Sequence, residues 1–266
     1  MSSRTINAIK SGQVVMVSAG AAGIGRTIAE TFLAHDCHVH IFDIDTVAIS
    51  DFLENHPRAS ATRADISNVA QVEEVFEQLT QRYGRLDVLV NNAGIAGPTA
   101  HAEDIEPAEW EQTVAVDLNG HFYCTRKAIP LLRASCGCII NIASNAALSG
   151  CPGRAPYTAS KWAIVGLTKT LAMELGPDGV RVNAICPCSV DGERIRAVIE
   201  RDAKKRGQSA EKIREVYLRQ SSLRTFVSPQ DVANLALFLA SDLGCKISGQ
   251  AIGLDGHTET LANWVD

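Results

Sequence analysis

A tyrosine and a lysine four residues apart are the side chains whose types and spacing best suit catalysis. On a helix, Tyr157 and Lys161 lie one turn apart and share a face. A phenol with an ordinary pKa of about 10 is a poor base at neutral pH, but a neighbouring ammonium favours the phenolate. The pair therefore suits general acid/base chemistry, although the same spacing alone is common on solvated helix faces. Ser144 follows the apolar run Cys138–Ile142, and a strand there would end beside this helix.

A second segment, from Ser18 to Gly25, is rich in small residues and follows the apolar run Val14–Val17. Small residues let the backbone turn tightly and approach a pyrophosphate, which the amides and dipole of the following helix stabilise. Asp43 ends the next apolar run, where a carboxylate would meet an adenosine ribose. The pattern predicts a dinucleotide site. The alternative is an ordinary tight turn, with Asp43 as a helix cap.

Asp43 also bears on the choice of cofactor. A carboxylate accepts hydrogen bonds from ribose hydroxyls and repels a 2′-phosphate, which would require an Arg or a Lys. The neighbouring residues that would have to supply this positive charge do not: they are Ala21, Ala22, Ile44 and Asp45. The sequence therefore predicts NAD rather than NADP.

Apolar runs and helical patterns alternate along the chain, and these elements must position the residues above. Strands are expected at Val14–Val17, Val39–Phe42, Ala59–Arg63, Leu86–Val90, Cys138–Ile142, Val180–Ile185 and Ala251–Leu254. Helical periodicity follows the glycine turn and recurs near residues 69–83, 107–133, 156–175 and 229–241. Such alternation indicates an α/β fold, with a parallel sheet covered by helices on both faces.

The chain shows no interdomain linker, so residues 1–266 are expected to form a single domain. One irregular, charged stretch at about 191–226 is interpreted as an insertion over the carboxyl ends of the strands. Parallel sheets bind their ligands at that edge. Basic and acidic residues are mixed in the stretch, so a solvated helix face explains most of its charges.

Composition excludes several classes of partner. With 25 basic and 30 acidic residues, the formal net charge is −5, which gives no net attraction to nucleic acid or anionic lipid. No run approaches the ~18 apolar residues of a membrane helix, and residues 1–12 lack the apolar stretch of a signal peptide, so a cytoplasmic location is expected. The eight cysteines include no Cys-x-x-Cys pair and are interpreted as reduced thiols, with no metal site.

Together these segments resemble the classical short-chain dehydrogenase/reductase family over essentially the whole chain. The residues that carry the resemblance, in family order, are Ser18 to Gly25, Asp43, Asp65-Ile66, Asn91 to Gly94, Ser144, Tyr157 with Lys161, and Arg181 to Pro187. The family implies a three-layer, doubly wound Rossmann-type fold with a seven-stranded parallel sheet, usually in a homotetramer.

The resemblance also assigns roles. Tyr157 would be the general acid/base, Ser144 would orient the substrate oxygen, and Lys161 would bind the nicotinamide ribose and lower the pKa of the tyrosine. Asp65 and Ile66 would touch the adenine. The full set implied to bind the cofactor is Ser18, Ala19, Gly20, Gly23, Ile24, Gly25, Asp43, Asp65, Ile66, Asn92, Ala93, Gly94, Tyr157, Lys161, Pro187 and Val190.

The sequence departs from the family pattern in four respects. The usual Thr-Gly that opens the glycine motif is Ser18-Ala19, a change that cofactor binding should survive. The family's catalytic Asn, on the long interface helix, falls on Asp117, whose backbone carbonyl could still hold a proton-relay water. Cys188 replaces the family's Gly after Pro187, and Gly192 stands where a Thr is common. The contacts to the carboxamide of NAD can therefore differ from those of the family.

The leading hypothesis is an NAD-dependent enzyme that interconverts a small polar secondary alcohol, such as a sugar, polyol or hydroxy acid, with its carbonyl compound. Arg154, three residues before Tyr157, would stand near the substrate and could bind a carboxylate, or it could be a solvated loop residue. A non-catalytic NAD-binding sensor or scaffold of the same fold is the alternative. An epimerase or dehydratase using the same Tyr and Lys would normally need a longer chain with a second substrate lobe.

Overall fold

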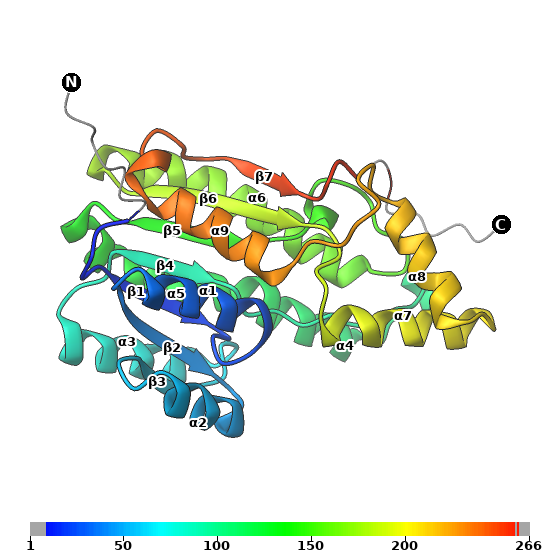
Figure 1. Ribbon diagram of the computed structural model, residues 1–266, viewed down its shortest axis with the longest axis horizontal. Coiled ribbons are helices and arrows are strands. Elements are labelled where there is room, and N and C mark those ends of the chain that lie inside the picture. The colour runs from blue at the N-terminus through cyan, green and yellow to red at the C-terminus, as the bar shows by residue number, and fades with distance from the viewer. Residues whose placement is uncertain (1–8, 259, 261–266) are drawn as a thin grey trace.

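A parallel sheet of seven strands forms the centre of the computed structural model, which describes residues 9–258 and 260 (Figure 1). The strand order is β3-β2-β1-β4-β5-β6-β7. Each expected strand is present, with bounds shifted by only a residue or two. The strands are β1 (Val14–Ser18), β2 (His38–Asp43), β3 (Ser60–Arg63), β4 (Val88–Asn91), β5 (Cys138–Ile142), β6 (Arg181–Pro187) and β7 (Ala251–Leu254).

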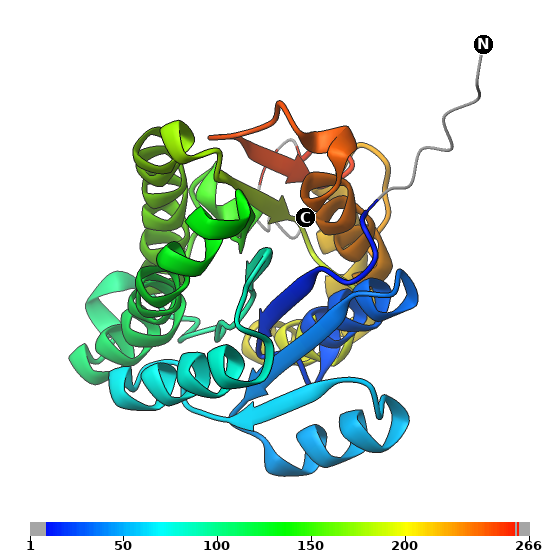
Figure 2. The same ribbon diagram turned by 90° about the vertical axis from the view of Figure 1, so that its left-hand side faces the viewer.

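Helices cover both faces of the sheet, which confirms the three-layer Rossmann-type fold (Figure 2). Along β1, Val15 and Val17 pack on the face covered by α1, α2 and α9, whereas Val14 and Met16 pack on the face covered by α3, α5 and α6. A strand buried on both faces must be apolar at every position, as this one is. These helices are α1 (Gly23–Ala34), α2 (Thr46–Asn55), α3 (Val69–Tyr83), α5 (Gly120–Ser135), α6 (Ala155–Leu175) and α9 (Pro229–Ala240).

The helical pattern expected over residues 107–133 is confirmed, because the chain is helical without a break from Pro107 to Ser135. Within this stretch a π-helical turn (Ala115–Asn119) separates α4 (Pro107–Val114) from α5. A π turn inserts an extra residue into the helical ladder and often occurs at functional sites. Asp117 lies in this turn.

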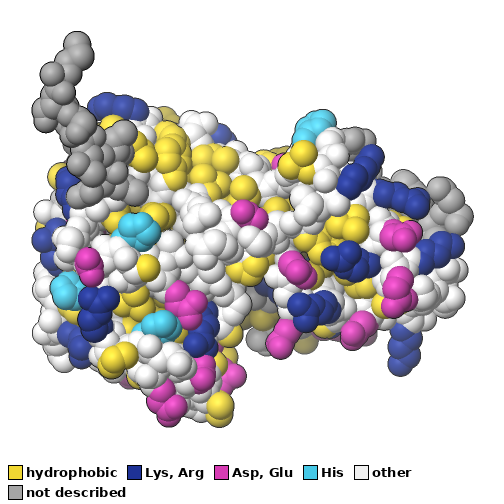
Figure 3. Space-filling model, viewed as in Figure 1, with side chains coloured by type: hydrophobic (Ala, Val, Ile, Leu, Met, Phe, Trp, Pro, Cys, Tyr) yellow, Lys and Arg dark blue, Asp and Glu magenta, His cyan; other side chains and the backbone are white. Residues whose placement is uncertain are grey.

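Residues 191–226 form two helices, α7 (Glu193–Arg206) and α8 (Ala210–Arg219), which extend beyond the carboxyl end of the sheet (Figure 1). A parallel bridge between Val190 and Val227 joins the two ends of this segment. Basic and acidic side chains are intermixed over its surface (Figure 3). The mixture agrees with a solvated helix face.

Neither a membrane-spanning helix nor a metal-binding cluster is present in the part of the chain that the structure describes. Within residues 9–258 and 260, no helix combines the length and apolarity needed to cross a membrane. The same residues contain no group of three or more His, Cys, Asp or Glu side chains placed to hold a metal ion. Residues 1–8, which make up most of the segment judged for a signal peptide, lie outside the described residues.

Candidate active site

The turn after β1 is fixed by hydrogen bonds to the end of β4. The Ser18 hydroxyl accepts from the backbone N–H groups of Asn92 (2.8 Å) and Ala93 (3.0 Å). The Asn92 side-chain amide donates to the carbonyl oxygens of Ser18 (3.0 Å) and Ala19 (3.1 Å). Strands β1 and β4 flank the point where the strand order reverses, which is where doubly wound sheets bind nucleotides.

Two glycines of this turn leave no room for a side chain. A Cβ at Gly20 would lie 2.6 Å from Cγ2 of Ile41, and a Cβ at Gly25 would overlap the carbonyl oxygen of Ala19. Ala19 itself has φ 49°, in the left-handed region that disfavours a residue with a Cβ. The departure from the family's Thr-Gly therefore places a strained alanine where glycine would be relaxed.

Asp43, at the end of β2, faces the same turn. Its carboxylate accepts from the N–H groups of Ala21 (3.1 Å) and Asp45 (3.2 Å). Sequence reasoning missed Arg63, which is the register partner of Asp43 on β3 and is exposed. Arg63 therefore lies at the end of β3, next to the end of β2 that carries Asp43. This proximity is visible only once the register of the two strands is known.

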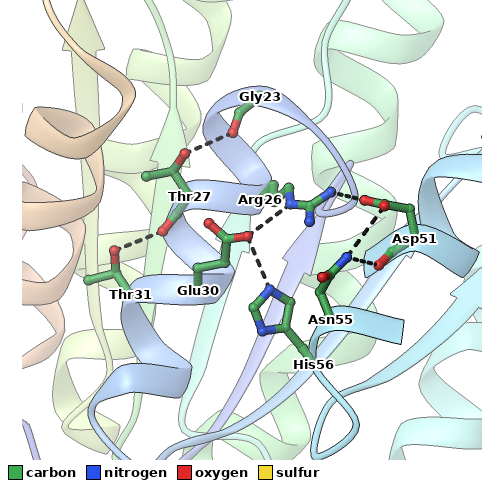
Figure 4. Close-up of polar contacts among 8 residues, drawn as sticks. All are labelled: Gly23, Arg26, Thr27, Glu30, Thr31, Asp51, Asn55 and His56. Atoms are coloured by element: carbon green, nitrogen blue, oxygen red, sulfur yellow. Dashed lines mark hydrogen bonds and ion pairs between the residues drawn. The ribbon is translucent and has the colours of Figure 1, made fainter. Parts of the chain in front are cut away.

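The basic residue that directly follows the glycine turn, Arg26, is held by carboxylates (Figure 4). Its Nε lies 2.8 Å from Glu30 Oε1, and its Nη1 contacts Asp51 on α2. His56 binds the same Glu30 oxygen at 3.1 Å. The hydrogen bonds to Asp51 and Glu30 raise the pKa of Arg26 above its ordinary value. The Arg26 guanidinium thus links α1 to α2 through the carboxylates of Glu30 and Asp51.

Lys161 connects α6 to the end of β5. Its ammonium is buried, donates to the carbonyl oxygen of Ile142 at 3.1 Å and lies 3.8 Å from Asp117 Oδ2. The same Nζ is 5.7 Å from the centroid of the partly exposed Tyr157 ring. The phenol, the ammonium and a carboxylate are therefore close together at the carboxyl edge of the sheet.

Asp117 contributes its side chain to this cluster. The carboxyl is fully buried, and Oδ1 accepts from the N–H of Ile95 at 2.7 Å. Oδ2 has no hydrogen-bond partner among the described residues. Burial raises the pKa of Asp117, while the Lys161 ammonium and the Ile95 N–H act in the opposite direction. A Cβ at Gly94 would come within 3.4 Å of Asp117 Oδ1.

His121 was missed by the sequence reasoning and supports the loop after β4. The ring is completely buried, and Nε2 lies 2.8 Å from the carbonyl oxygen of Ala93. Burial lowers the pKa of His121 to about 3, so the ring is neutral and Nε2 carries the proton that the carbonyl accepts. Nδ1 is then an acceptor without a partner in the described chain. Its spacing from Asp117, four residues along the chain, was the available signal.

Ser144 lies two residues beyond the carbonyl that receives Lys161. Its hydroxyl accepts from the N–H of Ala146 at 3.1 Å and caps a short 3-10 helix, Asn145–Ala147. Ala147 packs with Ile164 of α6. The structure thus brings the strand end that carries Ser144 against the helix that carries Tyr157, as the sequence predicts.

The remaining predicted cofactor residues lie at or just beyond the strand ends. Asp65 follows β3 and accepts from the N–H and the hydroxyl of Ser67. Ile66 is buried. It lies so close to Gly120 that a Cβ on Gly120 would be 2.7 Å from the Ile66 side chain. Pro187 ends β6, and Val190 forms the bridge to residue 227.

Two arginines flank Tyr157, of which only Arg154 was predicted. Arg154 is half-buried, donates Nη2 to the carbonyl oxygen of Ala96 at 2.7 Å, and has its Cζ 4.9 Å from the Tyr157 ring centroid. Arg194, from the first turn of α7, donates Nη1 to the carbonyl oxygen of Gly94 at 3.3 Å. Its Cζ is 5.8 Å from the same centroid. The mixed charges of residues 191–226 gave no signal in the sequence that Arg194 lies beside Tyr157.

Comparisons with known proteins agree with this geometry. Residues 19–257 match the family model described as enoyl-(acyl carrier protein) reductase. The chain is 34% identical to trans-4-hydroxycyclohexanecarboxylate dehydrogenase of Sinomonas cyclohexanicum, over 94% of each chain. The fold, the site and these matches define one class: the chain belongs to the classical short-chain dehydrogenase/reductase family, whose members matched here act on alcohols and ketones.

Solved structures with nicotinamide cofactors give the same result. A 3-ketoacyl-(acyl-carrier-protein) reductase from Brucella melitensis complexed with NADH has a TM-score of 0.83 and 30% identity, covering 92% of this chain and 98% of that one. An actinorhodin polyketide ketoreductase with NADPH has a TM-score of 0.88 and 28% identity, covering 92% and 96%. The two neighbours thus hold different forms of the cofactor.

Proposed function

We propose that this protein is an NAD-dependent oxidoreductase that interconverts a small polar secondary alcohol and its carbonyl compound. The observation that carries the proposal is the buried Lys161 ammonium beside the Tyr157 ring, at the sheet edge that also holds the glycine turn. The turn fits a dinucleotide, because it lies at the amino end of α1 and because Gly20 and Gly25 are packed too closely against Ile41 and Ala19 for any side chain, which keeps the turn tight. Asp43 adds a carboxylate beside the turn for ribose hydroxyls.

In alcohol oxidation, the Tyr157 oxygen takes the hydroxyl proton of the substrate. The Ser144 hydroxyl donates a hydrogen bond to the substrate oxygen as it becomes a carbonyl. A nicotinamide cofactor bound at the glycine turn would supply the hydride acceptor for this oxidation. Lys161 keeps a positive charge next to the phenolate and anchors that charge on the Ile142 carbonyl. In carbonyl reduction, Tyr157 returns the proton.

Tyr157→Phe tests the assignment of the base. We expect kcat to fall by a factor of about 10² or more while the dissociation constant of NADH stays nearly unchanged, because the ring is retained and only the proton acceptor is lost. Steady-state kinetics on an alcohol panel and NADH fluorescence titration measure the two quantities. A wild-type protein that binds NADH but oxidises no alcohol would instead support the sensor or scaffold alternative.

The preference for NAD rests on Asp43. We expect kcat/KM with NAD to exceed that with NADP by at least about tenfold, because the carboxylate repels a 2′-phosphate. Asp43→Ala combined with Ile44→Arg should narrow the ratio. Arg63→Gln tests the neighbouring cation. It should lower activity with NADP further and leave activity with NAD unchanged. Equal efficiency of the wild type with both cofactors would contradict the preference.

We also propose that the protein assembles as a homotetramer. Large apolar side chains are exposed on neighbouring helices of one face: Phe122 of α5 is 47% exposed and Trp162 of α6 is 49% exposed. On the opposite face, Phe238 of α9 is 38% exposed. The exposed apolar side chains on the neighbouring helices α5 and α6 support a contact between protein chains on that face. Light scattering at micromolar concentration should give four times the mass of the chain, and a stable monomer would contradict the proposal.

A further inference from the structure

Two arginines from distant segments of the chain each lie close to the ring of Tyr157. Arg154 precedes the catalytic helix α6, and Arg194 comes from α7, in the segment that extends beyond the sheet. Their Cζ atoms lie 4.9 Å and 5.8 Å from the Tyr157 ring centroid. Because Tyr157 is the proposed base, a group bound by both guanidinium groups would lie beside the reacting alcohol.

The local charge balance is strongly positive. Three cations lie close to the Tyr157 ring: Arg154, Arg194 and Lys161. The carboxylate of Asp117 interacts electrostatically with all three. That carboxylate is buried, and its Oδ2 lies 3.8 Å from Lys161. The carboxylate of Asp117 thus matches one ammonium, and the guanidinium groups of the half-buried Arg154 and the exposed Arg194 remain beside the ring. A substrate carboxylate would compensate the charge of Arg154, which is partly shielded from water, and a neutral sugar or polyol would not.

The two arginines also have donors to spare. Arg154 uses Nη2 on the carbonyl of Ala96, while its buried Nε has no hydrogen-bond partner among the described residues. Arg194 uses Nη1 on the carbonyl of Gly94. Both side chains are therefore anchored on the same backbone stretch, residues 94–96, with further N–H groups left over. Planar guanidinium forks match the two oxygens of a carboxylate.

We propose that Arg154 and Arg194 form a carboxylate-binding pair that selects hydroxy acids, and the corresponding oxo acids, as the substrates of this enzyme. The inference rests on the proposed oxidoreductase function and narrows its substrate class. Because Arg194 belongs to α7, a bound carboxylate would also hold the helix segment of residues 191–226 over the site. Arg154 alone could not provide this connection.

Binding of malonate and its neutral analogue malonamide to the NADH-bound protein tests the pair without turnover. Calorimetry should show malonate binding at least about tenfold more tightly than malonamide. Arg154→Gln and Arg194→Gln should each weaken malonate binding by about tenfold or more and leave malonamide unaffected, because each removes a charge-assisted hydrogen bond. Arg154→Lys keeps the positive charge and should lose less malonate affinity than Arg154→Gln. This difference separates the loss of anion binding from damage to the loop before α6.

Arg196→Gln is the matched control, since Arg196 is an exposed arginine on the same helix that makes no ring contact with Tyr157. It should bind malonate as the wild type does. In kinetics, 3-hydroxybutyrate should exceed 3-hydroxybutyramide in kcat/KM by about tenfold or more, and Arg194→Gln should reduce the advantage mainly through KM.

Several results would overturn the inference. Equal use of the acid and the amide by an active enzyme would remove the substrate class while the oxidoreductase function stands. Weaker NADH binding in Arg194→Gln, with malonate binding unchanged, would assign this arginine to the cofactor pyrophosphate instead. Malonate binding that depends on both arginines, in a protein that oxidises no alcohol, would overturn the proposed function and reduce the pair to an anion site.

Discussion

Two buried polar clusters in this molecule differ in how completely their hydrogen bonds are paired. At the edge of the sheet, His40 of β2 places Nδ1 2.8 Å from the Ser60 hydroxyl and Nε2 3.2 Å from the Thr62 hydroxyl. Ser60 continues to the hydroxyl of Tyr83 at 2.9 Å, and Thr62 donates to Gln78 at 2.7 Å. Every polar side chain in this edge cluster has a partner within the protein.

The cluster around Tyr157 is paired only in part. Oδ2 of Asp117, Nδ1 of His121 and Nε of Arg154 are all buried and have no hydrogen-bond partner among the described residues. A buried polar atom without a partner is costly and calls for an explanation. The edge cluster is satisfied within the protein, whereas the cluster at Tyr157 leaves donors and acceptors unpaired, as the proposed active site would require.

The largest expected effect comes from breaking the paired cluster. His40→Ala should lower the free energy of unfolding by about 3 kcal/mol, because it leaves a cavity and removes two hydrogen bonds. At the same time kcat should stay unchanged. Urea denaturation and steady-state kinetics measure the two effects. His38→Ala, an exposed histidine on the same strand, is the control and should cost about 0.5 kcal/mol or less.

The same cluster should make stability depend on pH. Burial lowers the pKa of His40 to about 4, from an ordinary value of 6.5. The unfolded chain therefore binds a proton between these pH values that the folded protein does not, and stability falls as the pH drops through this window. Between pH 7 and 5 the loss assigned to His40 is about 2 kcal/mol.

Urea denaturation at both pH values would measure this loss. His40→Gln should show a correspondingly smaller difference between pH 7 and 5, because the substituted side chain does not titrate. His121, whose pKa is lowered to about 3 by burial, adds a similar dependence that persists in the variant. An equal pH dependence in the variant and the wild type would show that His40 is not buried as a neutral ring.

The sequence predicted the sheet and the helix that carries both Tyr157 and Lys161 because both depend on local patterns. A short apolar run bounded by turns identifies a buried strand wherever it occurs, and Tyr157 with Lys161 share a face on any helix. Arg63 and Arg194 were not found, because their importance comes from strand register and from a helix packed against a distant loop. The π turn also escaped detection, since one extra residue in a turn leaves almost no trace in periodicity.

Asp117→Asn sharpens the comparison within the site. The asparagine can still accept from the Ile95 N–H, but it leaves Lys161 without its carboxylate, while Arg154 and Arg194 remain and His121 stays neutral. An uncompensated ammonium favours the phenolate, so the acid limb of kcat/KM for alcohol oxidation should move to lower pH by about one unit. Initial rates between pH 6 and 10 measure it. An unmoved profile would mean that only the backbone at this position acts.

The smallest expected effect concerns the strained turn after β1. Ala19→Gly should raise the free energy of unfolding by about 1 kcal/mol, because glycine adopts a φ of 49° without a Cβ clash. NADH affinity should change little, since the hydrogen bonds from Asn92 go to backbone carbonyls. Thermal unfolding compared with Ala22→Gly, at an exposed position with φ −142°, separates relief of strain from the general effect of glycine.

The bridge that closes the base of residues 191–226 has a consequence for the length of this segment. The N–H of Asp191 donates to the carbonyl of Val227 at 2.8 Å, and the N–H of Val227 donates to the carbonyl of Ser189 at 3.1 Å. Because both ends leave the sheet at one point, the length of the intervening chain changes the closure entropy only logarithmically. Segments of other lengths and charges can therefore be accommodated at this junction while the sheet keeps its fold.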